Sequence, residues 1–146
     1  MRLIVDASVL VGEALRLRGL RLLADPQLDL VIAEETWSET VHELQRRVDL
    51  LVAAERVEPA AATELLDAAA NVMRACVTVA SSELYADRLD EARRRIPRDV
   101  SDAPTVALGL ALDCGIWTAD QDFFGCGLPV WTTETLLAQL GVEPGP

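Results

Sequence analysis

Short apolar runs of four or five residues recur along the chain, separated by longer amphipathic stretches. The runs cover residues 2–5, 29–33, 76–80, 115–118 and 129–132. Runs of this length that are rich in Val, Ile and Leu predict buried β-strands. Because the runs are continuously apolar rather than alternating, we expect strands that are covered on both faces.

The stretches between these runs have the periodicity of helices. Apolar residues from Trp37 to Leu51 recur at spacings of four and three, which places them on one stripe of a helix. Pro59 leads into an alanine-rich helix, and Gly115 can terminate an apolar one. The predicted helices span residues 8–24, 36–51, 60–75, 82–95, 103–113 and 133–140.

The alternation of strands and helices predicts a parallel sheet, because parallel neighbours need a crossover connection. We therefore expect an α/β fold, a three-layer sandwich with a central, mostly parallel sheet flanked by helices. The length of 146 residues suits one domain with a sizeable core. No linker or repeat divides the chain, so residues 1–146 are predicted to form a single domain, with residues 141–146 as a frayed tail.

Composition and charge bear on the binding partners and the cellular location of the protein. The formal net charge is −11, which argues against general affinity for nucleic acid. No apolar run approaches the ~20 residues that span a bilayer, so no membrane segment is expected. Cys76, Cys114 and Cys126 lack the spacing of a metal site, and we expect them to be reduced thiols of a cytoplasmic protein.

Acidic residues follow the predicted strands at the points where those strands end. Asp6 comes directly after the first strand, and Asp120 and Asp122 come directly after the fourth. Glu39 lies on the helix after the second strand, and Asp102 begins the helix that returns to the fourth. Because the carboxyl ends of parallel strands share one edge, and ligands bind beyond that edge, we expect these acids to converge there.

Each acid also has a local explanation. Asp6 could cap the first helix, Asp102 could cap the helix that follows it, and Asp122 could belong to a turn. Thr36 and Glu39 have the spacing of a capping box. Four independent caps would have no reason to gather at one edge of the sheet, so the joint pattern favours a functional site.

Carboxylates held close together require a counter-charge. Two of them ~5 Å apart repel by roughly 3 kcal/mol at an effective dielectric of about 20. A site of carboxylate oxygens without Cys or His favours the hard cations Mg²⁺ or Mn²⁺, and such ions support hydrolysis of phosphodiester bonds. Ser8 and Thr118 could orient the acids or a bound water, or simply pack, and His42 is expected on the surface.

Three segments of the chain carry a resemblance to a known family. They read IVDASVLV near the start, SETVHELQRR in the middle, and DAPTVALGLALDCGIWTADQDFFG near the end. In this order the segments resemble the PIN-domain nucleases over nearly the whole chain. The paired closing motifs are fairly specific to that family, whereas the glutamate motif is weak.

By position, the resemblance implies roles for the acids. Asp6, Asp102 and Asp120 correspond to acids that bind metal and act in catalysis, and Asp122 corresponds to a residue that can hold a second metal ion. The family implies Mg²⁺- or Mn²⁺-dependent cleavage of RNA, commonly by the toxin of a VapC-like toxin–antitoxin pair. It also implies a homodimer and inhibition by an antitoxin protein.

The family's catalytic helix glutamate has two candidates in this chain. Glu39 is favoured because Leu44, Arg46 and Arg47 follow it as the motif expects. Glu43 is the alternative, one helical turn further from the edge of the sheet.

The acidic chain offers few basic groups for RNA. Arg46 and Arg47 on one helix and Arg94 and Arg95 on another are the candidates for RNA binding, although a solvated helix face explains them equally well. The negative charge leaves room for a second hypothesis. On that hypothesis the protein is a PIN fold that cleaves poorly and acts through dimer or partner contacts.

Other α/β folds with acids at strand ends fit the sequence less well. Receiver domains of response regulators and phosphatases of the haloacid-dehalogenase type both rely on a lysine, and the chain contains none. The segment GCGLP lacks the helix context of a phosphate-binding loop. The main hypothesis from the sequence is therefore a PIN-like, metal-dependent ribonuclease.

Overall fold

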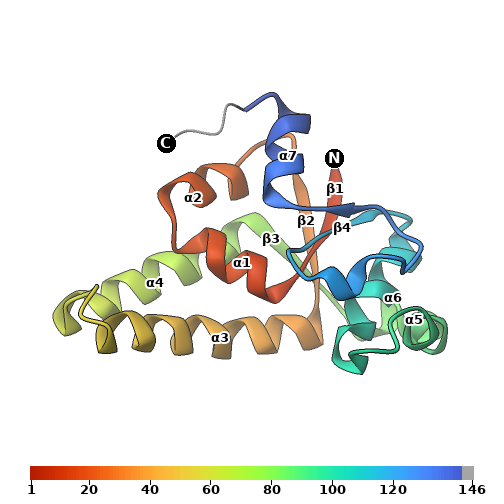
Figure 1. Ribbon diagram of the computed structural model, residues 1–146, viewed down its shortest axis with the longest axis horizontal. Helices are drawn as coiled ribbons and strands as arrows, with labels where there is room; N and C mark the ends of the chain where they lie inside the picture. The colour runs from red at the N-terminus through yellow and green to blue at the C-terminus, as the bar shows by residue number, and fades with distance from the viewer. Residues whose placement is uncertain (143–146) are drawn as a thin grey trace.

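The computed structural model describes residues 1–142, and residues 143–146 of the predicted frayed tail lie outside the described part of the chain. In the described part, helices surround one five-stranded sheet (Figure 1). The strands are β1 (Arg2–Val5), β2 (Asp29–Ala33), β3 (Val77–Ala80), β4 (Gly115–Trp117) and β5 (Val130–Trp131). The helices are α1 (Ala7–Ala14), α2 (Leu17–Leu23), α3 (Glu34–Ala53), α4 (Pro59–Cys76), α5 (Leu89–Arg95), α6 (Ala103–Leu112) and α7 (Thr133–Leu140).

All strand pairs in the sheet are parallel, and the spatial order is β3-β2-β1-β4-β5. The central strand β1 pairs with β2 on one side and with β4 on the other. Val5 lies opposite Trp117, so β1 and β4 end side by side. The predicted α/β fold with a parallel sheet is confirmed, and the residues that follow β1 and β4 share one edge.

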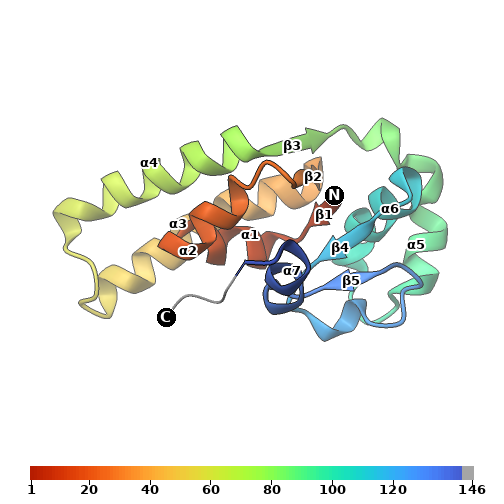
Figure 2. The same cartoon turned by 90° about the horizontal axis from the view of Figure 1, so that it is seen from above.

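Alternate residues of each strand point to opposite faces of the sheet and divide the core in two. Leu3 and Val5 pack with residues of α1, α2, α3, α4 and α7 on one face. Ile4 and Ile116 pack with residues of α5 and α6 on the other face. The sheet is therefore the middle layer of a three-layer sandwich, as predicted, and Figure 2 shows α5 and α6 on the side opposite α1 and α2.

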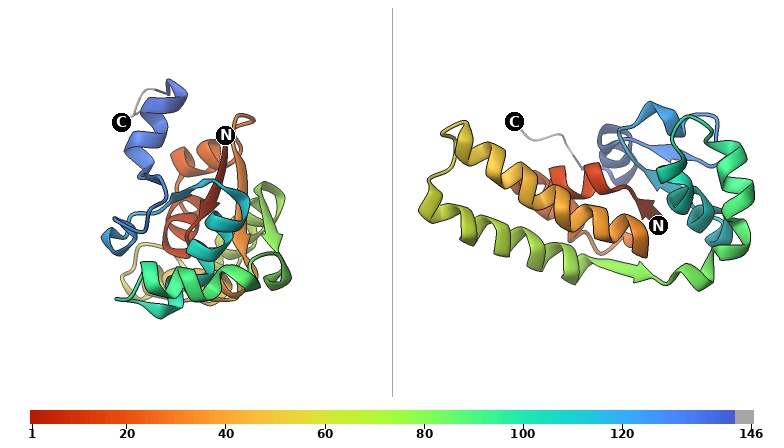
Figure 3. Two further views of the ribbon diagram at one scale, coloured as in Figure 1. Left: turned by 90° about the vertical axis from the view of Figure 1, so that its right-hand side faces the viewer. Right: turned by 90° about the horizontal axis from the view of Figure 1, so that it is seen from below.

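Helices α3 and α4 form a long antiparallel pair that extends beyond the sheet (Figures 2 and 3). Buried Leu44 and Val48 of α3 belong to the same core cluster as Ala69 and Met73 of α4. The amphipathic stripe predicted for α3 is therefore the face that packs on its neighbours. The first turns of α3 lie next to the end of β2, and this brings the acids of α3 to the edge of the sheet.

The predicted helix over residues 8–24 is wrong in one respect, because the chain forms two helices there. α1 ends at Ala14 and α2 begins at Leu17. Gly19 in α2 lies so close to the backbone of Glu13 that a Cβ atom at this position would collide with it. The break lets α2 cross closely over the end of α1. The apolar pattern of the sequence continues through the break and therefore did not predict it.

The predicted helix over residues 82–95 is also shorter than expected. Residues 82–88 form two 3₁₀ turns, and only α5 continues as an α-helix. The turns are tied to the start of α3, because the amide of Ser82 donates to Glu34 (2.8 Å) and the buried Tyr85 hydroxyl donates to Glu35. These tertiary hydrogen bonds hold the segment in a tighter conformation than its sequence predicts.

None of the helices in residues 1–142 combines the length and the apolar character needed to cross a membrane.

Candidate active site

A hollow lined by carboxylates lies at the edge of the sheet where β1 and β4 end. The amide of Asp6 donates to the carbonyl of Trp117 (3.0 Å), which extends the pairing of the two strands by one bond. The hollow has a volume of about 420 Å³, and we call it the acidic hollow. The acids that line it are Asp6, Glu39, Glu43, Asp102 and Asp120.

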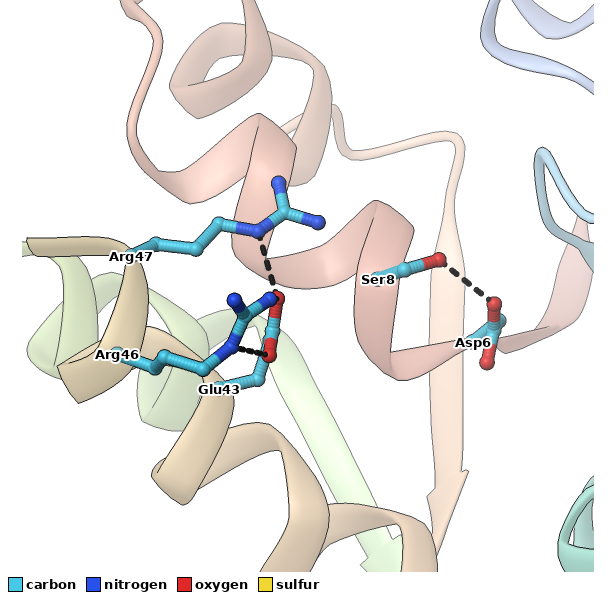
Figure 4. Close-up of polar contacts among 5 residues, drawn as sticks. All are labelled: Asp6, Ser8, Glu43, Arg46 and Arg47. Carbon is cyan, nitrogen blue, oxygen red and sulfur yellow. Dashed lines mark hydrogen bonds and ion pairs between the residues drawn. The ribbon is translucent and has the colours of Figure 1, made fainter. Parts of the chain in front are cut away.

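Asp6 is the most buried of these acids, with 8% of its surface exposed. Its Oδ2 accepts hydrogen bonds from Ser8 Oγ (2.9 Å, Figure 4) and from Thr118 Oγ1 (3.0 Å). Burial raises the pKa of Asp6 above its usual range, and these two hydrogen bonds offset only part of that rise. Thr118 Oγ1 also accepts from the amide of Asp120 (3.0 Å), so one buried hydroxyl links the acids that follow β1 and β4.

Asp102 lies half-buried at the start of α6. Its Oδ2 is buried and has no hydrogen-bond partner among the described residues. Burial, and after it the charges of Asp6, Asp99, Asp120 and Glu39, raise the pKa of Asp102 to about 7. A buried oxygen without a partner, surrounded by negative charge, is an environment in which a cation would be strongly stabilised.

Helix α3 brings two glutamates to the acidic hollow. Glu43 is engaged by arginines: Arg46 donates to both of its oxygens (2.7 and 2.8 Å), and Arg47 donates to one (2.9 Å), as Figure 4 shows. The bond from Arg46 is the main reason that the pKa of Glu43 lies at about 2. Glu39 forms no ion pair within the described residues, and partial burial, with Asp6 nearby, raises its pKa.

Asp120 and Asp122 diverge after β4. Asp120 lines the acidic hollow, and its Oδ1 accepts from the amide of Asp122 (2.8 Å), which caps a 3₁₀ turn over Gln121–Phe123. The Asp122 side chain does not line the hollow and instead pairs with Arg98 (3.3 Å). The turn therefore directs the side chains of Asp120 and Asp122 to different places, although only one residue separates them in the sequence.

Capping does not explain the positions of Asp6, Asp102 and Glu39. Asp6 and Asp102 precede α1 and α6, but neither side chain accepts a capping hydrogen bond. The alternative explanation of Thr36 and Glu39 as a capping box is contradicted, because α3 begins earlier, at Glu34, and both residues lie inside the helix. The position of Glu39 at the hollow is therefore set by the packing of α3.

The side chains of the acidic hollow suit a hard divalent cation. Within residues 1–142, no three His, Cys, Asp or Glu side chains lie close enough to coordinate one ion as they stand. The donors at the hollow are nevertheless oxygens, Asp6 is held by two hydroxyls, and Asp102 Oδ2 lacks a partner, so Asp6, Asp102 and Asp120 are the residues that could hold an ion.

The four arginines that were candidates for RNA binding have different surroundings. Arg46 lines the acidic hollow. Arg47 points toward α1 (Figure 4). Arg95 donates to the carbonyl of Cys126 (3.0 Å) and pairs within its own helix, so its contacts are structural. Arg94 is exposed and does not line the hollow.

Two residues at this edge were not part of the predicted site. His42 is exposed, as expected, but it also lies at the rim of the acidic hollow. Asp99 raises the pKa of both Asp102 and Glu39. Its position three residues before Asp102, in the loop that leads to α6, was the signal in the sequence.

The family profile of the PIN domain matches residues 4–141, which include every acid of the hollow. The chain belongs to the PIN-domain family. PIN domains are generally nucleases. The resemblance based on three short segments is thus confirmed for the family.

Solved structures share the architecture of this PIN domain at low sequence identity. PAE2754 from Pyrobaculum aerophilum is 20% identical, with a TM-score of 0.67 over 98% of this chain and 97% of that one. VapC20 from Mycobacterium tuberculosis, described as a toxin that cleaves the sarcin–ricin loop, is 21% identical, with a TM-score of 0.54 over 86% and 95% of the two chains. FitAcB from Neisseria gonorrhoeae is 18% identical, with a TM-score of 0.53 over 90% and 96%. A comparison with curated proteins finds no match.

Proposed function

We propose that this PIN domain is a Mg²⁺- or Mn²⁺-dependent ribonuclease that hydrolyses phosphodiester bonds at the acidic hollow. The observation that carries the proposal is the convergence of Asp6, Glu39, Asp102 and Asp120 around one hollow, together with the unpartnered Oδ2 of Asp102. So much negative charge at one site is costly without a cation. The family, whose members are generally nucleases, supports the same chemistry.

Asp6, Asp102 and Asp120 would hold the metal ion in this proposal. A bound Mg²⁺ or Mn²⁺ supplies a positive charge that stabilises the charge developing on the phosphate oxygens and lowers the pKa of a bound water. Ser8 and Thr118 restrict the rotation of the Asp6 carboxylate through their bonds to Oδ2. Asp122 is not needed for a first ion, because it pairs with Arg98 outside the hollow.

Glu39 is the residue that we assign to proton transfer. Its carboxylate lines the hollow and is not neutralised by an arginine, unlike that of Glu43. It would accept a proton from the attacking water as the water oxygen bonds to phosphorus. The ester P–O bond then breaks, and the departing oxygen takes up a proton from the solvent. Partial burial raises the pKa of Glu39, so its carboxylate is a stronger base than a fully solvated one.

The biological role that we propose is that of a toxin in a toxin–antitoxin pair, acting on RNA in the cytoplasm as a homodimer and inhibited by an antitoxin protein. Support comes from the family and from the shared fold of VapC20, which is described as a toxin. Expression of the chain without a partner is then expected to arrest growth. A small gene that overlaps the start of its own gene would be the candidate antitoxin.

The direct test is incubation of total RNA with the purified protein in Mg²⁺, in Mn²⁺ and in excess chelator, followed by mapping of the new RNA ends. We expect cleavage in either metal and none in the chelator. Restoration of cleavage when Mg²⁺ is added back serves as the control for irreversible damage. Equal cleavage in metal and in chelator would contradict the proposed chemistry.

A second candidate function follows from the net charge of −11. Such a chain repels RNA at long range, which fits a PIN fold that binds a partner and cleaves poorly. Tight partner binding without cleavage of any tested RNA, in either metal, would favour this function over the ribonuclease.

Replacement of Thr118 by valine is expected to reduce cleavage by about 10- to 100-fold, because residues that orient metal ligands typically have effects of this size. Valine keeps the shape but loses the bonds to Asp6 and to the amide of Asp120. The measurements are kcat, KM and the Mg²⁺ concentration at half-maximal activity. Thr118→Ser is expected to restore activity, because it keeps the hydroxyl. A Thr118→Val protein that is fully active would show that this link does not position the site.

A further inference from the structure

A second hollow adjoins the acidic hollow and is lined by arginines. Its volume is about 400 Å³, and we define it as the arginine hollow by Arg16, Arg18 and Arg47. Ser8 lines both hollows, and Ala119, the residue before Asp120, lines the arginine hollow as well. The two hollows therefore meet beside the residues that follow β1 and β4.

The three arginines come from two segments that the fold brings together. Arg16 lies at the break between α1 and α2, Arg18 lies in the first turn of α2, and Arg47 lies on α3. Arg47 is bonded to α3 and lies close to α1. Its Nε donates to Glu43 (2.9 Å, Figure 4), and its Nη1 lies 3.3 Å from the point where a Cβ atom on Gly12 of α1 would be. The absence of a side chain at Gly12 leaves room for the guanidinium against α1.

Two of the three arginines in the hollow are not neutralised by an acid of the described residues. Seven of the chain's arginines form ion pairs with acids, but Arg16 and Arg18 form none within the described residues. Two acids, Glu13 and Glu134, also line the hollow. Glu13 is buried, and its Oε1 accepts from Thr133 Oγ1 (2.9 Å). The guanidinium groups of Arg16 and Arg18 are therefore available to bind an anion, although the whole chain carries a charge of −11.

We infer that the arginine hollow binds a phosphate of the substrate strand that neighbours the phosphate being cleaved. This inference rests on the proposed ribonuclease function. Guanidinium groups bind phosphate oxygens through paired hydrogen bonds, and phosphate contacts set the register of a nucleic-acid strand. A strand that passes over Ser8 would place one phosphate at the acids and the next at the arginines. An acidic protein can thereby bind RNA locally in spite of its net charge.

The inference is tested by RNA binding in an Asp120→Asn background, which prevents cleavage. The affinity of a labelled single-stranded oligoribonucleotide is measured by fluorescence anisotropy at several salt concentrations. The test protein carries Arg16→Gln and Arg18→Gln. The matched control carries Arg21→Gln and Arg74→Gln, which remove the same charge from exposed arginines that line neither hollow.

We expect the test protein to bind RNA about tenfold more weakly, and the control protein to change less than about threefold, because phosphate contacts dominate affinity. The slope of log affinity against log salt should fall by about 1.4 in the test protein, at about 0.7 for each lost contact. In the cleaving protein, the same two substitutions should raise KM about tenfold and leave kcat nearly unchanged, as expected for a contact made equally in the ground and transition states.

Equal loss of RNA affinity in the test and control proteins would overturn the inference, because it would show a general charge effect. Arginine-dependent binding of an oligoglutamate peptide, with RNA binding unaffected, would assign the hollow to an acidic peptide instead. Metal-dependent cleavage with an unchanged KM in the Arg16→Gln, Arg18→Gln protein would overturn the inference and leave the ribonuclease intact. Arginine-dependent RNA binding without cleavage would overturn the ribonuclease and support the phosphate site.

Discussion

Substitution of Asp120 by asparagine is expected to reduce metal-dependent RNA cleavage at least about 10³-fold. Asparagine keeps the size of the side chain and one oxygen but removes the charge that attracts a divalent cation. Loss of the several kcal/mol that a metal contributes to the transition state corresponds to a rate effect of this order. The same loss is expected for Asp6→Asn and Asp102→Asn, because all three acids line the same hollow.

The measurement is the initial rate of cleavage of a mapped RNA substrate in saturating Mg²⁺. Asp67→Asn is the matched control, because Asp67 is exposed on α4 and does not line the acidic hollow. Glu39→Gln should reduce the rate by about 10²-fold or more, as loss of a general base does. Glu43→Gln should reduce the cleavage rate less, because Glu43 is neutralised by Arg46 and Arg47. Variants of Asp6 and Asp120 that cleave as fast as the wild type would refute the assignment of the site.

The metal-free protein is expected to lose about 2 kcal/mol of stability between pH 5 and pH 8, most of it because of Asp102. The pKa of Asp102 is about 7 in the folded state and near 3.8 in the unfolded chain. Between these values the folded state keeps a proton that the unfolded state has lost, so the free energy of unfolding falls as the pH rises. Within this range each pH unit lowers the free energy of unfolding by about 1.4 kcal/mol. Water around the half-buried carboxyl group screens its charge and reduces the total loss to about 2 kcal/mol.

Chemical denaturation in the presence of a chelator, at several pH values, measures this effect. Asp102→Asn should be more stable than the wild type at pH 8 and should show a flatter pH dependence, because it removes the buried charge. Glu43, whose pKa lies at about 2, titrates below this window and does not interfere. Added Mg²⁺ should stabilise the wild type more than the variant. If the free energy of unfolding varied with pH in the same way in both proteins, the pKa of Asp102 would not be raised in the folded state.

The sequence by itself predicted the layered parallel sheet and the acids at its edge. The strands that hold Asp6 and Asp120 are continuous apolar runs, and each acid follows its strand directly. Local hydrophobic periodicity determines such elements, and the rule for parallel sheets determines which strand ends meet. Convergence at the edge therefore needed no knowledge of long-range contacts.

The sequence could not predict where α1 ends or how the segment before α5 is wound. The break before Arg16 depends on the close crossing of α2 over the backbone of Glu13. The turns around Tyr85 depend on the partly buried hydrogen bond to Glu35, 50 residues away in the chain. Contacts between residues distant in sequence override local propensity in both places.

The positions of the charged residues could be predicted from the sequence, but their roles depend on the tertiary structure. The sequence identified acids at the strand ends, because their positions are local facts about each strand. Only the tertiary structure decided that Asp122 pairs with Arg98, that Glu43 is neutralised by two arginines, and that Arg16 and Arg18 lie beside the site. A charged side chain acquires its role from its neighbours in space, and on helices and loops those neighbours are set by packing.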